Sequence, residues 1–380
     1  MCLLKISVEN FFLNNPIEIS FSVGLEGMYV SGNTLERNLD KTVALVTEML
    51  TEPRWDEKSF EIVKNRRLNI IKQRKTSAQS VAFNALSKQL YGKDHPASTP
   101  LGGTEESVES ISMNDIKNYF KENISPQVSH FHVAGKMTQS TIEKSLQQLS
   151  KNWIGSNVEI PEIKTSKSPT RARVYFIDIP GAKQSAITLG SLSIPGGNPE
   201  LYKYSVVNNR LGGGMEARLM RTLRLEKGYT YGAGSFFREN SYQTPFYAYS
   251  QVRSNVTLES LEIFKNIING YAESYNSEDL ELTKNKLIKQ NALRFERLGS
   301  LLNMLDTISK FNFPDTYIQR QQDVLTSMSL EEAQSIAESQ FNADKMYFVV
   351  AGDAKTQLSR IKELGYGNPI MLDREGNRIK

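Results

Sequence analysis

Several residue types and patterns are scarce in this 380-residue chain. It has one cysteine, Cys2, and three histidines. A single thiol excludes an internal disulfide framework and any zinc site built from several cysteines. No apolar run approaches the roughly 20 residues that a membrane-spanning helix needs, so we expect no membrane span. The 46 basic and 42 acidic residues are scattered, with a net charge of +4 and no basic arm, which argues against a nucleic-acid partner.

Residues 1–15, MCLLKISVENFFLNN, lack the features of a signal peptide. They have no basic leader, no long apolar stretch and no small-residue cleavage site. Cys2 is not expected to be a lipoprotein cysteine, because no leader precedes it. The compartment therefore stays open between periplasm and cytoplasm.

The overall composition is that of a folded protein. Hydrophobic residues make up 39% of the chain and charged residues 23%, close to ordinary globular usage. A length of 380 residues exceeds what one hydrophobic core usually supports, so we expect two domains.

An internal repeat divides the chain. Residues 112–136 align without a gap on residues 329–353, at an offset of 217. Each segment predicts a helix opened by a serine N-cap, Ser112 or Ser329, with an acid three residues later, followed by a β-rich run that ends in Ala-Gly. The pattern indicates two copies of one α+β domain.

The same offset relates other segments. It pairs the alternating apolar run at 28–35 with that at 246–252. The amphipathic helix predicted from Glu61 also falls close to the sequence position that the offset gives for the helix predicted from Glu281. These correspondences extend the repeat over most of the chain.

We predict a first domain at 1–155, a linker at 156–170 and a complete second domain at 171–380, with an antiparallel-rich sheet packed by helices. The linker is rich in Ser, Pro and Lys. Applied in reverse, the offset puts the start of the first copy about 46 positions before Met1. We therefore expect that copy to lack its opening strands and first helices, through a truncation, a mis-set start or a frameshift.

The segment 211–237, LGGGMEARLMRTLRLEKGYTYGAGSFF, carries the candidate site. Arg224 falls in the last turn of a predicted helix, where a cation suits the helix dipole. Gly228 can end that helix in a left-handed conformation, and Tyr231 follows on a strand. A guanidinium and a phenol so placed could both donate hydrogen bonds to a peptide carbonyl or its oxyanion. The alternative is a solvated cation and a core aromatic.

This segment resembles the signature of the M16 metallopeptidases, the insulinase-type inverted zincins. Residues 37–60 and 91–108 also resemble that family's first-domain helices and connecting loop. The resemblance implies two α+β domains of the LuxS/MPP-like type and hydrolysis of peptide bonds. It also implies that Arg224 and Tyr231 bind peptides or unfolded polypeptides and stabilise the tetrahedral intermediate.

The family's zinc site requires H-x-x-E-H on a helix and a downstream Glu, and this sequence has no such motif. His95 lies beside Pro96 in a loop. His130 and His132 could share one face of a strand, but that run is typical of an ordinary strand. Glu105, Glu106 and Glu109 crowd a helix start, where acids favour the dipole.

We therefore expect no catalytic residue and no metal in this chain, which would be inactive alone. Zinc would be bound by a partner half or subunit that carries the motif, and Arg224 and Tyr231 would complete that site. The alternative is a non-proteolytic structural or peptide-binding core protein, or a truncated remnant.

Overall fold

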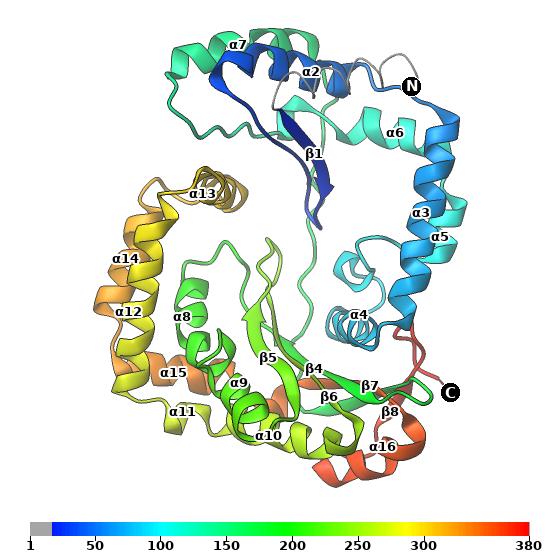
Figure 1. Cartoon of the computed structure of the whole chain (residues 1–380), viewed down its shortest axis with the longest axis vertical. Helices are drawn as coiled ribbons and strands as arrows, with labels where there is room; N and C mark the ends of the chain where they lie inside the picture. The colour runs from blue at the N-terminus through cyan, green and yellow to red at the C-terminus, as the bar shows by residue number, and fades with distance from the viewer. Residues whose placement is uncertain (1–16, 380) are drawn as a thin grey trace. The chain divides into compact units, whose positions relative to one another are not determined.

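The computed structural model describes residues 17–379, so predictions about residues 1–16 lie outside the described part. These residues form two compact units. The first comprises residues 17–71 and 101–162, and the second comprises residues 72–100 and 163–379. Both units contain helices and strands, which confirms the α+β class (Figure 1).

A six-stranded mixed sheet forms the centre of the second unit. Its order is β5-β6-β4-β7-β3-β8. The pairs from β5 to β7 are antiparallel, whereas β3 is parallel to both of its neighbours. The strands are β3 (Arg173–Asp178), β4 (Gln184–Leu192), β5 (Thr230–Phe237), β6 (Pro245–Arg253), β7 (Tyr347–Gly352) and β8 (Ile370–Leu372).

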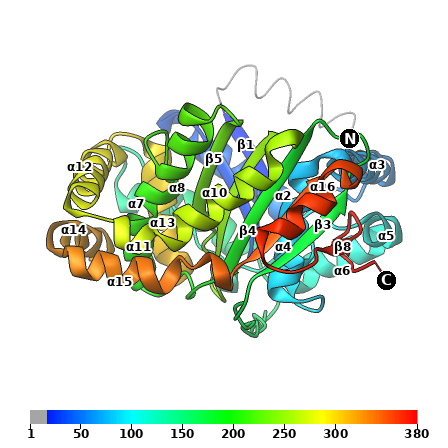
Figure 2. The ribbon, with the colours of Figure 1, turned by 90° about the horizontal axis from the view of Figure 1, so that it is seen from below.

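Both faces of this sheet are covered because its central strands are apolar on both sides. In β4, Ile187 and Leu189 join one buried cluster, and Ala186 and Leu192 join another. Figure 2 shows α10 and α16 in front of the strands. The helices that contribute to the first cluster include α8 (Glu200–Gly212), α9 (Arg218–Met220), α10 (Thr257–Asn269), α15 (Leu330–Gln340) and α16 (Ala354–Ile361).

The opposite face is covered by α4 (Ala78–Tyr91), which comes from the middle of the predicted first domain. Val81, Ala85 and Leu86 are fully buried against β4 and β7. The compact units therefore do not follow the predicted boundaries. The sequence shows that α4 is amphipathic, but a helix does not specify which sheet its apolar side will meet.

The other helices of the second unit extend beside α8. Helix α12 packs against α8 and α14, and α14 also contacts α8. Their bounds are α11 (Tyr271–Ser274), α12 (Ser277–Arg294), α13 (Leu298–Phe311) and α14 (Tyr317–Ser327). None of the described helices is long and apolar enough to cross a membrane.

The first unit has a two-stranded sheet, in which β1 (Glu18–Val23) pairs antiparallel with β2 (Met28–Asn33). Helix α2 (Leu39–Thr51) packs against α7 (Gln139–Asn152). The remaining helices are α3 (Glu57–Thr76), whose last residues enter the second unit, α5 (Glu105–Ser110) and α6 (Met113–Asn123).

The element bounds keep the spacing of the predicted repeat. Helices α6 and α15 have eleven residues each and begin 217 residues apart, each after a serine whose hydroxyl accepts a backbone N–H. The short 3-10 helices η3 (Pro126–Val128) and η6 (Ala343–Lys345) follow at the same spacing.

One predicted strand is wrong. Residues 130–135, HFHVAG, were expected to form a strand like their counterpart β7, but they pair with no strand of residues 17–379. In the second unit β7 is held between β4 and β3. No described strand occupies the equivalent positions in the first unit, and a strand exists only where a neighbour accepts its hydrogen bonds.

Candidate functional site

The glycines at 212–214 end α8 and bring it against β5. A side chain at Gly212 would overlap the backbone amide of Ser235. Asn208 donates to the carbonyl of Ser235 at 2.9 Å, and the hydroxyl of Ser235 donates back to the Asn208 amide oxygen. Lys286 donates to the carbonyl of Gly213 at 3.1 Å. These glycines permit close packing of helix and strand, as expected for a turn.

Arg224 lies in a short π-helix, η4 (Arg221–Glu226), that continues α9. Leu219 and Leu223 are fully buried and anchor this segment in the core. The N–H of Lys227 donates to the carbonyl of Thr222, which closes the wide turn. Such turns are rare and frequently occur at functional sites.

The end of η4 agrees with the predicted geometry. Gly228 adopts φ +62°, the left-handed conformation expected of a helix-ending glycine. Its N–H donates to the carbonyl of Arg224 at 3.2 Å, and the N–H of Tyr229 donates to that of Leu223 at 2.9 Å. The Arg224 side chain is half-buried, and its guanidinium lies 3.7 Å from the sulfur of Met215.

Tyr231 lies at the start of β5 and is 87% exposed. The alternative of a core aromatic is therefore wrong. The register shifts between Thr230, which pairs with Val252, and Ala233, which pairs with Ser250. This β-bulge interrupts the alternation along the strand, so Ala233 enters the core while Tyr231 stays in solvent.

Hydroxyl groups hold the bulge, and sequence reasoning missed them. The Thr230 hydroxyl accepts the N–H of Gly232 at 3.0 Å and lies 2.7 Å from the carbonyl oxygen of Gln251. Ser250 donates to the carbonyl of Gly232 at 3.0 Å. The nearest sequence signal was Thr230 directly before Tyr231, but a hydroxyl does not reveal a bulge by itself.

Arg224 and Tyr231 are brought onto contiguous elements, since η4 contacts β5. In the described part of the chain, no hydrogen bond joins the two side chains. The exposed phenol and the half-buried guanidinium are instead both accessible to a third molecule. The structure thus places the predicted pair on neighbouring elements that contact each other.

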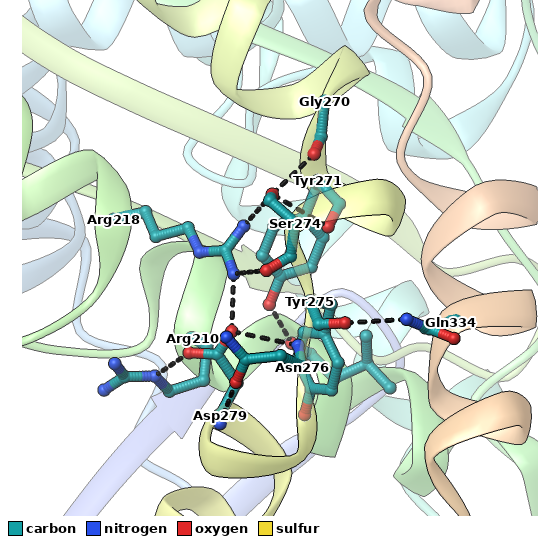
Figure 3. A network of polar contacts seen from close by, with 10 residues as sticks. Arg210, Arg218, Gly270, Tyr271, Ser274, Tyr275, Asn276, Asp279 and Gln334 are labelled. Atoms are coloured by element: carbon teal, nitrogen blue, oxygen red, sulfur yellow. Dashed lines mark hydrogen bonds and ion pairs between the residues drawn. The ribbon is translucent and has the colours of Figure 1, made fainter.

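A buried ion network supports the same region (Figure 3). Asp279 of α12 accepts from the Nε of Arg210 at 2.9 Å and forms an ion pair with Arg218 of α9. Arg218 also donates to the hydroxyl and carbonyl of Ser274 and lies over the ring of Tyr271. The network joins α8, α9, α11 and α12.

Opposing effects set the charge state of Asp279. Its burial by itself raises the pKa, but the hydrogen bond from Arg210 and the charge of Arg218 hold the pKa below the usual range of a carboxyl. The carboxylate therefore stays ionised between two arginines. It also accepts the N–H of Asn276, which closes the capping box of α12.

The histidines take structural positions. His95 accepts the N–H of Ala97 through Nδ1 at 3.1 Å and stacks on Tyr91, with ring centroids 4.6 Å apart. The rings of His130 and His132 lie parallel with centroids 6.2 Å apart. Among residues 17–379, no group of three or more His, Cys, Asp or Glu could hold a metal ion.

The three glutamates at 105–109 lie in α5, whose start is capped by Thr104. The hydroxyl of Thr104 accepts the N–H of Ser107, and the Ser107 hydroxyl accepts the N–H of Thr104. This capping box confirms that Glu105 and Glu106 occupy the first turn of a helix.

Part of the chain matches a known protein family, and several known proteins are similar to it. Residues 110–287 match a family described as the peptidase M16 inactive domain. A Helicobacter pylori protein named non-peptidase homolog YmxG is 23% identical over 347 residues, which cover 89% of this chain and 78% of that protein. The uncharacterized zinc protease YmxG of Bacillus subtilis is 26% identical over 210 residues, 53% of this chain and 48% of that protein.

Solved structures agree on the fold. The peptidase M16 inactive domain from Pseudomonas fluorescens superposes with a TM-score of 0.80 at 21% identity, over 90% of this chain and 82% of that one. A protease from Helicobacter pylori also gives 0.80, at 14% identity over 90% and 84%. The predicted resemblance to the M16 metallopeptidases is confirmed by the match of residues 110–287 to the inactive domain of that family.

Proposed function

We propose that this chain is the non-catalytic half or subunit of an M16-type zinc metallopeptidase, to which it contributes Arg224 and Tyr231 for substrate binding. The observation that carries the proposal is the exposure of Tyr231 on a β-bulge beside the helix end that bears Arg224. At 87% exposure the phenol of Tyr231 is open to a bound peptide.

The chemistry available to the pair is hydrogen-bond donation. A guanidinium and a phenol can both donate to the carbonyl oxygen of an extended peptide. Their donation strengthens when that oxygen becomes an oxyanion during peptide-bond hydrolysis, and a single donor of this kind is typically worth about 10²–10³ in kcat. The zinc that would activate water is assigned to the partner, because the described residues here offer no site for it.

A second candidate is a non-proteolytic core protein that binds peptides or scaffolds an assembly. The Helicobacter pylori relative is named a non-peptidase homolog, which favours this function. Arg224 and Tyr231 would then bind a polypeptide without contributing to its cleavage.

The test combines this chain with an M16 subunit that carries H-x-x-E-H and measures kcat and KM on an unfolded polypeptide. Arg224→Ala and Tyr231→Phe are each expected to lower kcat by about 10-fold or more, since each removes one donor. Arg221→Ala and Tyr119→Phe are matched controls, because both residues are exposed and lie outside the proposed pair.

Equal kcat for all variants in an active complex would exclude the proposed role of the pair. If the wild-type complex forms and binds the polypeptide without cleaving it, the second function is supported instead.

A further inference from the structure

Met215 is the most exposed methionine of the described residues. It is 51% exposed, whereas Met28 is 39% exposed and the other described methionines are half-buried or buried. Met215 lies in the exposed loop 213–216 between α8 and α9, where Gly214 adopts a φ of +148° that favours glycine. The N–H of Ala217 donates to the carbonyl of Gly214 at 3.1 Å, which closes the turn directly before α9. This loop therefore keeps the thioether of Met215 accessible to solvent.

The sulfur of Met215 contacts the guanidinium of Arg224. The sulfur and a terminal guanidinium nitrogen lie 3.7 Å apart, and a thioether sulfur is only a weak hydrogen-bond acceptor. Among residues 17–379, the Arg224 side chain has no other hydrogen bond and no carboxylate partner. A half-buried cation whose one acceptor is weak can change its partner when a stronger acceptor is formed beside it.

A peroxide converts a thioether into such an acceptor. The sulfur lone pair attacks one oxygen of hydrogen peroxide, the O–O bond breaks, and an S–O bond forms. The sulfur is oxidised to a sulfoxide, and the peroxide is reduced to water once the transferred oxygen has given its proton to the leaving hydroxide. The sulfoxide oxygen is polar, so its hydrogen bond to a guanidinium is stronger than the thioether contact that it replaces.

We infer that Met215 is an oxidative modification site whose sulfoxide oxygen binds the guanidinium of Arg224. This bond occupies a donor that is otherwise open to a bound peptide. Oxidation therefore weakens peptide binding, and reduction by a methionine sulfoxide reductase restores it. The oxidation and the new bond depend on this chain alone, whereas the effect on a peptide rests on the proposed function of Arg224.

The first measurement follows the oxidation of the full chain by hydrogen peroxide with peptide mass spectrometry. We expect Met215 to be oxidised about tenfold faster than Met220, because susceptibility follows exposure. Met220 is a matched control, since it lies five residues later in α9 and is half-buried. Oxidation of Met220 at the same rate or faster would overturn the assignment of the site.

The second measurement detects the new bond without any substrate. Exchange of the Arg224 side-chain N–H protons with water is followed by 15N NMR before and after oxidation, and Arg224→Lys identifies the signal. We expect this exchange to slow by about tenfold, as for a hydrogen bond to a charged group. Met215→Leu removes the sulfur and should abolish the effect of peroxide. Met215→Gln supplies a carbonyl oxygen and should slow the exchange without peroxide.

The third measurement uses the active complex of the proposed function. This chain is oxidised and freed of peroxide before it is mixed with the zinc-bearing subunit, and kcat/KM is measured on an unfolded polypeptide. Oxidation of the wild type should lower kcat/KM by about tenfold, as far as Arg224→Ala does. Oxidation of Arg224→Ala should lower it no further, and a methionine sulfoxide reductase should restore the wild-type value.

Two further outcomes overturn the inference. One is exchange at Arg224 that oxidation does not slow. The other is an oxidised wild type with unchanged kcat/KM, although Arg224→Ala lowers it. If Arg224→Ala has no effect on kcat either, the proposed function fails, while slowed exchange still supports the bond between Met215 and Arg224.

Discussion

At the scale of single residues, the carboxylate of Asp279 forms ion pairs with two arginines at once. Its side chain is only 9% exposed and lies between Arg210 and Arg218. Removing one partner of a buried ion network leaves the other charges without compensation, which usually costs more than the network adds over an apolar core. The network is therefore expected to be sensitive to loss of the carboxylate.

Asp279→Asn tests this environment, because it removes the charge and keeps the shape. At pH 7 we expect the free energy of unfolding of the second unit to fall by about 3–5 kcal/mol, measured by urea denaturation. Asp315→Asn is the control, since Asp315 is exposed, and it should change that free energy by less than about 0.5 kcal/mol.

The pH dependence of this difference has a defined sign. The folded pKa of Asp279 lies below its unfolded value of about 3.9. The stabilisation is therefore complete above about pH 4 and disappears as the pH falls through the folded pKa. A difference between wild type and Asp279→Asn that grew on acidification would contradict this.

At the scale of secondary-structure elements, the end of η4 and the start of β5 together position Arg224 and Tyr231. The π-helix η4 and the bulge in β5 both depart from regular geometry, and they flank Gly228. The regular neighbours, α8 and the rest of β5, are fixed by the close approach at Gly212. The irregular geometry is thus confined to the segment that carries Arg224 and Tyr231.

Thr230→Val tests the support of the bulge. Loss of the hydroxyl removes the acceptor of the Gly232 N–H, a bond worth about 1 kcal/mol, so exchange of that amide should accelerate about five-fold. Thr230→Ser keeps the hydroxyl and should exchange at the wild-type rate. Equal rates in all three proteins would show that the hydroxyl does not hold the bulge.

At the scale of the whole molecule, the second unit depends on a segment from far earlier in the chain. Helix α4 supplies one layer over the six-stranded sheet, including Leu86, Leu90 and Tyr91. Tyr91 also donates through its hydroxyl to the carbonyl of Gln243, and Ser87 and Tyr247 share a hydrogen bond of 2.8 Å. A fragment that starts after α4 would expose an apolar sheet face.

We therefore expect a fragment of residues 163–380 to bind a hydrophobic dye and to unfold without a cooperative transition. Adding a peptide of residues 72–100 should restore the transition, monitored by near-ultraviolet circular dichroism. The same peptide with Leu86→Asp should fail, because a charge would enter the buried cluster. Cooperative unfolding of the fragment alone would contradict the dependence on α4.

The sequence by itself determined much of the local structure. Helix starts were readable because a serine or threonine cap satisfies backbone N–H groups within three residues, as at Ser112 and Ser329. Gly228 marked the helix end, since glycine adopts positive φ without steric cost. The strands of the second unit followed from their apolar runs, and the segment from Arg224 to Tyr231 followed from these signals together.

Only the tertiary structure decided where these elements meet. It assigned α4 to the sheet of the second unit, placed Arg218 against Asp279, and gave residues 130–135 no neighbour among the described strands. It also inserted the bulge that keeps Tyr231 in solvent. Caps and periodicity depend on residues a few positions apart, whereas sheet pairing, register and ion pairs depend on residues that the chain brings together only when it folds.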